Sequence, residues 1–501
     1  MSIFASLTRI QFSFAVLFAA VALVLRYLLL FQNIDYDEAY TYLTYISQGV
    51  FVSWSTYNLP NNHVFNSILS VVTSNIFGAR PEIIRLWPFV FSIGSLPLFY
   101  LVLKKFFSNQ ISMMASVVAW LSFPMIFYSA QARGYSGQIF FFYLALVFFL
   151  YFGQRTLGFW LSVISVSFAL LFIPTTLFAL LIFGFVFVLQ DLNNKSRIFL
   201  WIVYTGILTA FLYLPAMIYA LVLGTKTFGF QEEITGFFLM QKLQAILFFI
   251  QPSALKWLWI PQLFLCLVGF FASLKPGTAR PLAMGLLISL PVLVFIYPSA
   301  LVFERLWIWI IPCLFAFLFQ GIKELCQFSR SHWVDQVALG FFFIGVGTFT
   351  LKTSFDQSHV AHIQYENKSE SLFHDLDQIL QPGDFILVSQ PLVTELNYWA
   401  QLNQRSDHFS RFLIDGDWKY SMYRQNGSAE VLRSLLGKNK IYLIYDNEDQ
   451  LKKGIEMVLR YLNQDRKNPL SESNLELTPL SVQTKKAFLK EVKFQGVYKS
   501  E

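Results

Sequence analysis

The feature that most constrains this chain is a series of apolar runs, each long enough to cross a lipid bilayer. Ile10–Phe31 and Ile198–Leu223 reach the about 20 residues that a membrane-spanning helix needs. Backbone in lipid must satisfy its own hydrogen bonds, so such runs form helices outside a barrel pattern. Only 13% of the 501 residues are charged, about half the share of an ordinary soluble protein. The sequence predicts a polytopic α-helical membrane protein.

Length and apolar character predict about eleven spans up to Leu351. They are Ile10–Phe31, Ile83–Leu103, Ile111–Tyr128, Ser136–Phe152, Phe159–Phe172, Thr175–Leu189, Ile198–Leu223, Trp257–Ser273, Leu282–Tyr297, Val302–Gln320 and Val334–Leu351. Short cytoplasmic loops are enriched in Lys and Arg. With Arg9 inside, the later inner loops carry Lys104, Arg155 and Arg197. This pattern predicts a cytoplasmic N-terminus in a multi-pass protein.

Charge and cysteine content exclude several classes of protein. The net charge of +7 would suggest nucleic acid in a soluble chain, but here the cations fall between apolar runs, as membrane topology requires. We therefore expect no nucleic-acid partner. Cys266 and Cys313 lie within apolar segments and Cys326 in a short connection, so neither a disulfide nor a cysteine metal site is indicated. The first run carries Arg26 and exceeds a signal-peptide core, which predicts an uncleaved anchor.

Residues 32–82 form the predicted first external loop. Within them, Val64–Phe77 is apolar but short, and Asn66 and Ser70 interrupt it. This pattern is typical of an amphipathic helix that lies in the membrane interface. Counting it as a span would also reverse the charge pattern of all later loops.

After Leu351 the composition changes, which predicts a membrane domain over residues 1–351 and a soluble α/β domain over residues 352–501. In the second domain we expect helices at Phe373–Leu380 and Glu448–Tyr461 and strands at Asp384–Val388 and Ile441–Tyr445. An odd number of spans places this domain on the extracytoplasmic side.

An acidic cluster follows the first span almost directly, with Asp35, Asp37 and Glu38 flanking Tyr36. Carboxylates so close to hydrocarbon are costly unless they are solvated or paired, so they are candidate functional groups. Alternatively, the cluster is a solvated loop in which an Asp caps the next helix. The sequence leaves both interpretations open.

Arginines recur at predicted external helix ends, at Arg85, Arg133 and Arg305. Planar guanidinium groups bind phosphate oxygens with two donors at once, so a phosphate ligand would explain the three together. Alternatively, Arg85 snorkels to head groups and Arg305 pairs with Glu304. His63, in the first loop, is either structural or a ligand.

At these positions the chain resembles the polyprenyl-phosphate-sugar-dependent glycosyltransferases of the GT-C class, which include protein O-mannosyltransferases and the lipid A aminoarabinose transferase. The matching segments, which fall in the first 350 residues or so, are Asp37-Glu38-Ala39-Tyr40, Asn61-Asn62-His63, Arg85-Leu86-Trp87-Pro88, Ser129-Ala130-Gln131-Ala132-Arg133-Gly134-Tyr135 and Glu304-Arg305-Leu306. Two positions depart from the pattern of these relatives, and both bear on the substrate subgroup. Val64 and Phe65 follow His63 where relatives carry two prolines, and Gly134 replaces a bulkier residue.

The resemblance implies an inverting transferase that takes a sugar from a polyprenyl-phosphate donor and passes it to an extracytoplasmic acceptor. Asp37 would be the general base, oriented by Glu38, and the three arginines would stabilise the lipid phosphate. The implied substrate-binding residues are Tyr40, Asn62, His63, Tyr135 and Glu304. Some relatives use a divalent cation, but Asp35, Asp37 and His63 do not have the spacing of a metal motif. We therefore expect no cofactor, and a location in the inner membrane among its lipids.

Two other functions compete with transfer. A secondary transporter also carries charged groups near the membrane, although transporters place them near the midplane and between related halves. A non-catalytic scaffold would use the C-terminal domain to bind a partner and the acidic loop only as structure.

Overall fold

The structure is a computed structural model that describes residues 2–57, 61–190, 195–223, 259–296, 304–326, 332–364, 368–379, 385–388, 392–404, 412–414, 441–445, 475–479 and 488–494. The chain forms two compact units. The larger unit contains Met1–Phe31 and Tyr45–Gln364, and the smaller contains Gln32–Thr44 and Tyr365–Glu501. The smaller unit is thus assembled from two stretches that are far apart in the sequence.

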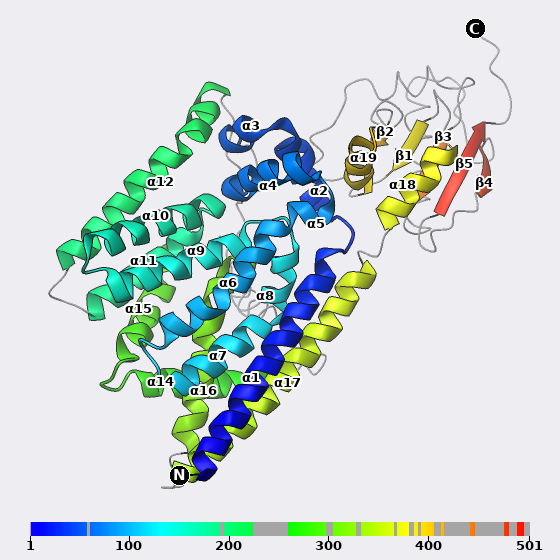
Figure 1. The fold of residues 1–501 in the computed structure, drawn as a ribbon. Coiled ribbons are helices and arrows are strands. Elements are labelled where there is room, and N and C mark those ends of the chain that lie inside the picture. The colour runs from blue at the N-terminus through cyan, green and yellow to red at the C-terminus, as the bar shows by residue number, and fades with distance from the viewer. Residues whose placement is uncertain are drawn as a thin grey trace. The chain divides into compact units, whose positions relative to one another are not determined.

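All regular secondary structure in the described residues of the larger unit is helical (Figure 1). Its helices are α1 (Ser2–Leu30), η1 (Ile46–Gln48), α3 (Val50–Ser55), α4 (Val64–Phe77), α5 (Pro81–Ile84), α6 (Leu86–Leu103), α7 (Asn109–Leu121), α8 (Phe123–Phe127), η2 (Tyr128–Ala130), α9 (Tyr135–Val147), η3 (Phe148–Phe152), α10 (Thr156–Phe172), α11 (Thr176–Gln190), α12 (Lys195–Leu223), α14 (Trp259–Ser273), α15 (Arg280–Ile296), η6 (Glu304–Ile310), α16 (Ile311–Cys326) and α17 (His332–Gln364). Each of the eleven predicted spans overlaps one of these helices or two or three consecutive ones.

Six helices of the described residues are long and apolar enough to cross a membrane, or seven if the bent pair α7 and α8 is one span. The six are Arg9–Leu30, Leu86–Leu103, Tyr135–Phe152, Lys195–Tyr219, Trp307–Cys326 and Val334–Ser358. The pair bends by 61°, next to Pro124, which lacks the N–H that would continue the helix. Shorter apolar helices include Thr156–Phe172 and Thr176–Gln190. The helical membrane class is confirmed, whereas the number eleven stays a prediction.

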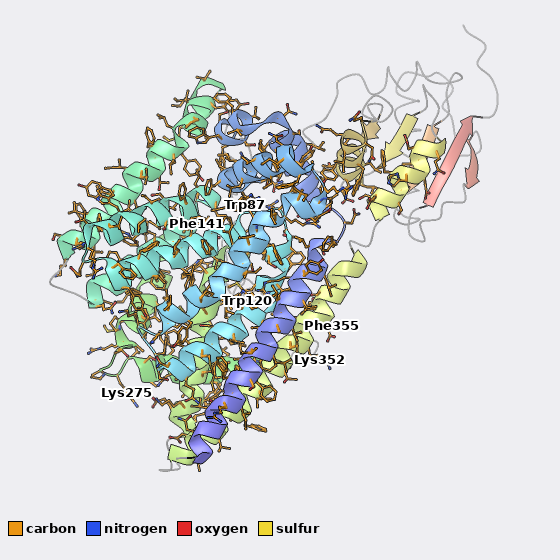
Figure 2. The ribbon with its side chains drawn as sticks, in the orientation of Figure 1. Trp87, Trp120, Phe141, Lys275, Lys352 and Phe355 are labelled. Atoms are coloured by element: carbon orange, nitrogen blue, oxygen red, sulfur yellow. The ribbon has the colours of Figure 1, made fainter. Side chains whose placement is uncertain are left out.

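Arg26 holds α1 against α6 and α7 deep inside the larger unit. Its guanidinium lies 3.8 Å from the ring centroid of Trp120, which Figure 2 labels. It also donates hydrogen bonds to Ser92 Oγ at 2.8 Å, the Trp120 carbonyl at 2.6 Å and the Ala22 carbonyl at 3.1 Å. The buried charge is therefore spread over neutral acceptors and an aromatic face. Helix α17 lies beside α1 along its length (Figure 1).

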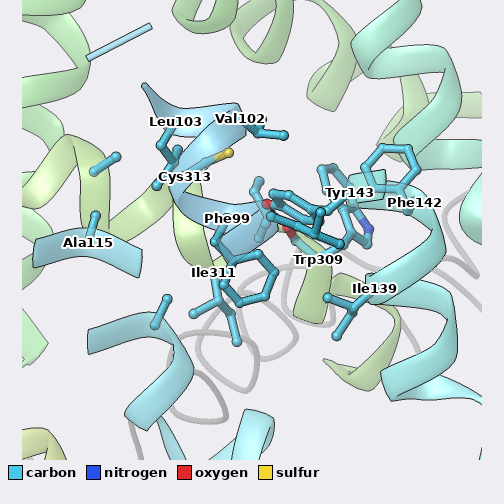
Figure 3. Close-up of a cluster of buried hydrophobic side chains, with 14 of the residues drawn as sticks. Phe99, Val102, Leu103, Ala115, Ile139, Phe142, Tyr143, Trp309, Ile311 and Cys313 are labelled. Carbon is cyan, nitrogen blue, oxygen red and sulfur yellow. Dashed lines mark hydrogen bonds between the residues drawn. The ribbon is translucent and has the colours of Figure 1, made fainter. Parts of the chain in front are cut away.

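Aromatic side chains fill the centre of the larger unit. Figure 3 shows Phe99, Tyr143 and Trp309 in this cluster. The rings of Phe99 and Tyr143 meet edge to face at 4.7 Å, and the Tyr143 hydroxyl donates to the Trp309 carbonyl at 2.8 Å. The cluster thus joins α6, α9 and η6, and it satisfies the one polar atom that Tyr143 brings into the interior.

The smaller unit combines helices with a mixed sheet. Its elements are α2 (Tyr36–Thr44), α18 (Lys368–Ile379), β1 (Phe385–Val388), α19 (Leu392–Leu402), β2 (Phe412–Ile414), β3 (Ile441–Tyr445), β4 (Leu475–Pro479) and β5 (Phe488–Phe494). The strand order is β2-β1-β3-β5-β4. Strand β1 pairs in parallel with β2 and β3, while β5 is antiparallel to β3 and β4.

Several elements predicted after residue 351 coincide with observed ones. The strands expected at Asp384–Val388 and Ile441–Tyr445 match β1 and β3, and the helix expected at Phe373–Leu380 lies in α18. The helix expected at Glu448–Tyr461 lies outside the described residues. The predicted domain boundary after Leu351 stays a prediction, and α17 continues through this position to Gln364.

Candidate active site

The first candidate site in the larger unit is the turn that leads into α9. Arg133 lies in this turn and is only 3% exposed. Its Nη1 donates a hydrogen bond to Asn61 Oδ1, and its guanidinium lies 6.0 Å from the ring centroid of Tyr135. A buried guanidinium needs compensating acceptors, because transfer of a charge out of water is costly. The turn therefore presents a fixed cationic group at the beginning of a spanning helix.

His63 lies against the same turn, and its ring meets the ring of Tyr135 edge to face at 5.3 Å. Its Nδ1 is 3.2 Å from the Phe172 carbonyl oxygen. A carbonyl oxygen only accepts, so in a neutral ring Nδ1 carries the proton and Nε2 keeps a lone pair. Nε2 is buried and has no hydrogen-bond partner among the described residues. The geometry thus leaves a buried acceptor beside Arg133.

The electrostatics of the site keep His63 neutral. Burial is the main cause that holds the pKa of His63 well below its usual range, and the charges of Arg133 and Arg305 lower it further. The hydrogen bond to Phe172 acts in the opposite direction. The influence of Arg305 on this pKa puts η6 within electrostatic reach of the imidazole. Three of the predicted site residues, His63, Arg133 and Arg305, thus act on one location.

Gly134 allows this close packing. A Cβ atom at this position would lie 2.9 Å from the Phe172 carbonyl oxygen and 3.0 Å from both Cβ and Nδ1 of His63. Those distances are too short for backbone neighbours to accept without moving. The glycine that departs from the resembled pattern therefore has a steric reason here.

Asn62 and Tyr57 surround the turn from the first loop. The Asn62 amide donates to the Ser53 carbonyl at 2.9 Å and the Thr56 carbonyl at 2.7 Å, and its oxygen accepts from Ser67 Oγ at 2.8 Å. Asn62 therefore shapes the loop. Burial, followed by Tyr135, raises the pKa of Tyr57 to about 12. Sequence reasoning did not select Tyr57, because a lone tyrosine near an aromatic-rich membrane face carries no distinctive signal.

The other two arginines differ in their surroundings. Arg85 is fully buried, so it does not snorkel to head groups. Its Nη1 donates to the Leu30 carbonyl at 3.0 Å, at the C-terminal end of α1, where a cation is favourable. Arg305 lies on η6 and is half-buried. The backbone of Glu304 begins η6, but its side chain lies outside the described part of the structure.

The acidic cluster belongs to the smaller unit and forms the beginning of α2. The Asp35 carbonyl accepts from the Ala39 N–H at 2.8 Å, and Glu38 Oε2 accepts from the Asp35 N–H at 3.0 Å. This arrangement is the return half of a capping box, in which the third helical residue satisfies the N-cap amide. Glu38 is fully buried, whereas Asp37 is partly exposed. Tyr40 lies one turn from Tyr36, with ring centroids 6.3 Å apart.

The smaller unit holds α2 through contacts with its C-terminal segment. Asn33 Nδ2 donates to Ser369 Oγ at 2.8 Å, and Tyr42 meets Tyr398 edge to face at 5.1 Å. Residues 32–44 therefore pack with α18 and α19, although the chain on either side of them belongs to the larger unit. Within the described residues, no group of three His, Cys, Asp or Glu side chains is placed to hold a metal ion.

Sequence reasoning also passed over Arg26 as a structural residue. An arginine within an apolar span is itself a signal that a specific interior partner is needed. The sequence does not identify that partner, because Ser92 and Trp120 are 66 and 94 residues away.

No family model and no curated protein matches the sequence. The fold, in contrast, is similar to that of ArnT from Cupriavidus metallidurans. The apo structure has a TM-score of 0.58 at 12% identity, and the complex with undecaprenyl phosphate has 0.55 at 14%. Both alignments cover 96% of this chain and 98% of the ArnT chain.

A second similarity is to the apo oligosaccharyltransferase from Archaeoglobus fulgidus, with a TM-score of 0.53 at 14% identity. It covers 90% of this chain and 71% of the archaeal chain. At such identities the likeness establishes the fold alone. It confirms the expected architecture: the chain is a multi-pass membrane protein with a GT-C-like fold.

Proposed function

We propose that this protein is an inverting glycosyltransferase that moves a sugar from a polyprenyl-phosphate donor to an acceptor. The observation that carries the proposal is that buried Arg133 and the acceptor nitrogen of His63 lie at one turn at the beginning of α9, both near the ring of Tyr135. It is supported by a fold similar to that of ArnT, which has been solved with undecaprenyl phosphate.

Arg133 would bind the lipid phosphate of the donor. A guanidinium offers two parallel donors to phosphate oxygens, and burial strengthens the interaction because little water screens it. Arg305 would add a second positive charge, in keeping with its effect on the pKa of His63. Arg85 would contribute less directly, since one of its donors holds the end of α1.

His63 would bind the sugar. Its Nε2 lone pair suits a hydroxyl donor and does not suit a phosphate oxygen, which is itself an acceptor. A sugar attached to a phosphate presents both groups next to each other. Tyr135 would support the same sugar with its ring, while Tyr40, Asn62 and Glu304 remain predicted substrate-binding residues.

Asp37 would be the general base of the reaction. The acceptor oxygen forms a bond to the anomeric carbon while the bond from that carbon to the phosphate oxygen breaks, and Asp37 takes the acceptor proton. The lipid phosphate leaves with the bonding electrons, and its charge is stabilised by arginine. Glu38 would position α2, because its carboxylate is a capping group. No cofactor is needed for this displacement.

We further propose an inner-membrane location with about eleven spans, a cytoplasmic N-terminus and an extracytoplasmic smaller unit. The Lys and Arg of the short loops support this orientation. The partners would be the lipid-linked donor, membrane lipids and a protein, lipid or glycan acceptor.

The test is release of free polyprenyl phosphate by the purified full-length protein from a panel of polyprenyl-phosphate sugars. We expect release by the native protein. Turnover should fall about 100- to 1,000-fold in Arg133→Ala, since loss of a preorganised donor costs about 2.7 to 4 kcal/mol, and by a comparable factor in Asp37→Asn. Arg80→Ala, at an exposed arginine, is the matched control and should keep native turnover. Native rates in Arg133→Ala would remove that residue from the site, and native rates in Asp37→Asn would reject the assigned base.

A further inference from the structure

A cavity lies at the end of α9 that is opposite to the turn with Arg133. Helix α9 and its continuation η3 contain 18 residues from Tyr135 to Phe152, a rise of about 27 Å at 1.5 Å per residue. Arg133 precedes the first end, and a cavity of about 320 Å³ lies at the second. This length is close to the about 30 Å thickness of the hydrocarbon core. The cavity and the candidate active site therefore belong to opposite faces of the membrane.

The cavity combines aromatic walls with one cation. Phe149, Phe187 and Ile198 provide apolar lining, and Gln154, Gln190 and Arg197 provide polar groups. The described lining residues include no carboxylate. Such a combination fits a ligand that has an anionic head and an apolar body.

The described residues do not use all the N–H donors of Arg197, which lines this cavity. Its Nη1 donates to Gln154 Oε1 at 3.2 Å, and its guanidinium lies 5.5 Å from the ring centroid of Phe159. Its Nε is buried and has no hydrogen-bond partner among the described residues. An N–H that is withdrawn from water without an acceptor is costly, and a bound phosphate oxygen would remove this cost.

The backbone helps to form the cavity. Residues Phe148–Phe152 form a short π-helix at the end of α9. Such π-helical turns are rare and recur at functional sites. The rings of Phe149 and Phe187 stack with centroids 4.4 Å apart, which fixes the apolar wall. A Cβ at Gly158 would overlap the Phe152 carbonyl oxygen, so the tight connection to α10 requires glycine.

We propose that this cavity binds the phosphate head group of an anionic phospholipid, with Arg197 as the main donor. Basic pockets between spanning helices at the cytoplasmic side suit such head groups, and the exposed Lys195 and Arg155 add positive charge nearby. A free inorganic anion has no apolar part that could pack against the aromatic lining, so a lipid fits the cavity better. The proposal is independent of the proposed sugar transfer, because it concerns the opposite end of α9.

The test is native mass spectrometry of the full-length, delipidated protein with phosphatidylglycerol or phosphatidylcholine of identical chains. We expect the native protein to bind phosphatidylglycerol more tightly than phosphatidylcholine. Arg197→Gln should bind phosphatidylglycerol about fivefold more weakly than the native protein does, which is the effect of one cation near an anionic lipid. Arg80→Gln, at an exposed arginine that does not line the cavity, is the matched control and should bind like the native protein. Asp191→Asn, a change outside the described residues, should not weaken binding.

Three outcomes would overturn the proposal. The first is equal binding of both lipids by the native protein, and the second is unchanged phosphatidylglycerol binding in Arg197→Gln. The third is saturation of the site by inorganic phosphate alone, which would assign it to a free anion. Thermal unfolding of each variant in detergent shows whether Arg197→Gln is folded, and Arg197→Lys, which keeps the charge, should bind between native and Gln levels.

Discussion

At the scale of single residues, the tautomer of His63 assigns different chemical tasks to two neighbouring side chains. Its Nδ1–H is engaged by the Phe172 carbonyl, so Nε2 can only accept while the ring is neutral. Arg133 can only donate. The proposed glycosyl phosphate satisfies both, because it carries hydroxyl donors close to anionic oxygens. Either residue alone would allow many more ligands.

The neutral state of His63 predicts a pH dependence of stability. Its folded pKa lies well below the usual value of about 6.5, so below pH 6.5 the unfolded chain binds a proton that the folded chain does not. Stability is therefore retained above pH 6.5 and falls below it, by up to about 1.4 kcal/mol per pH unit. We expect the thermal midpoint in detergent to fall less between pH 7 and pH 5 in His63→Gln than in the native protein. Equal decreases would contradict a neutral, buried His63.

The sequence identified most of the candidate residues but not all of their roles. Arg133 and His63 were selected from motifs, and the structure brings them together. The sequence suggested capping only by an Asp of the acidic cluster, so the capping role of Glu38 was not predicted. A carboxylate at the third helical position suits both capping and catalysis. The packing role of Gly134 depends on Phe172, 38 residues further along the chain, and no local pattern contains such a contact.

At the scale of elements, the beginning of α2 carries two carboxylates with different roles. Glu38 caps the helix, and Asp37 is the proposed general base. Glu38→Gln keeps an oxygen that accepts from the Asp35 N–H, so we expect near-native stability and turnover. Glu38→Ala removes the acceptor, and the loss of a cap costs about 1 kcal/mol, so its thermal midpoint and turnover should fall together. The measurements are thermal unfolding and donor turnover. A Gln variant as inactive as Asp37→Asn would show that the charge of Glu38 takes part in the chemistry.

Two glycines determine how closely α14 and α16 pack. A Cβ at Gly269 would overlap the Phe317 carbonyl oxygen, and one at Gly321 would overlap that of Leu265. Small residues at facing positions let membrane helices approach closely. Gly269→Ala should therefore lower the free energy of unfolding by about 1 to 3 kcal/mol, measured by denaturant titration in detergent. Gly345→Ala, with nothing within 4 Å of the added atom, should be neutral, and an equal effect of the two would refute the packing argument.

Helices were the most predictable part of the fold, because the bilayer permits few other structures. Each of the eleven predicted segments is helical over most of its described residues. Their ends were less predictable. The 61° bend between α7 and α8 falls inside one predicted span, since Pro124 interrupts the helix while the apolar run continues.

At the scale of the whole molecule, the assembly of the smaller unit lay beyond sequence reasoning. Gln32–Thr44 reads as part of an external loop of the membrane domain, yet it packs with residues more than 300 positions later. Hydrophobic periodicity describes one segment at a time, so it contains no information that pairs α2 with α19. This pairing makes the C-terminal segment a structural support for the residue proposed as general base.

Disruption of that support should act on Asp37 from a distance. Tyr398 is fully buried and its ring lies 5.1 Å from that of Tyr42 on α2. Removal of a buried aromatic ring costs about 3 kcal/mol or more, so Tyr398→Ala should increase hydrogen exchange in residues 32–44 and reduce donor turnover. Asn397→Ala, at the preceding and less buried position, should change neither. If exchange in residues 32–44 stays native in Tyr398→Ala, the C-terminal segment does not hold α2, and a loss of turnover in that variant would need another cause.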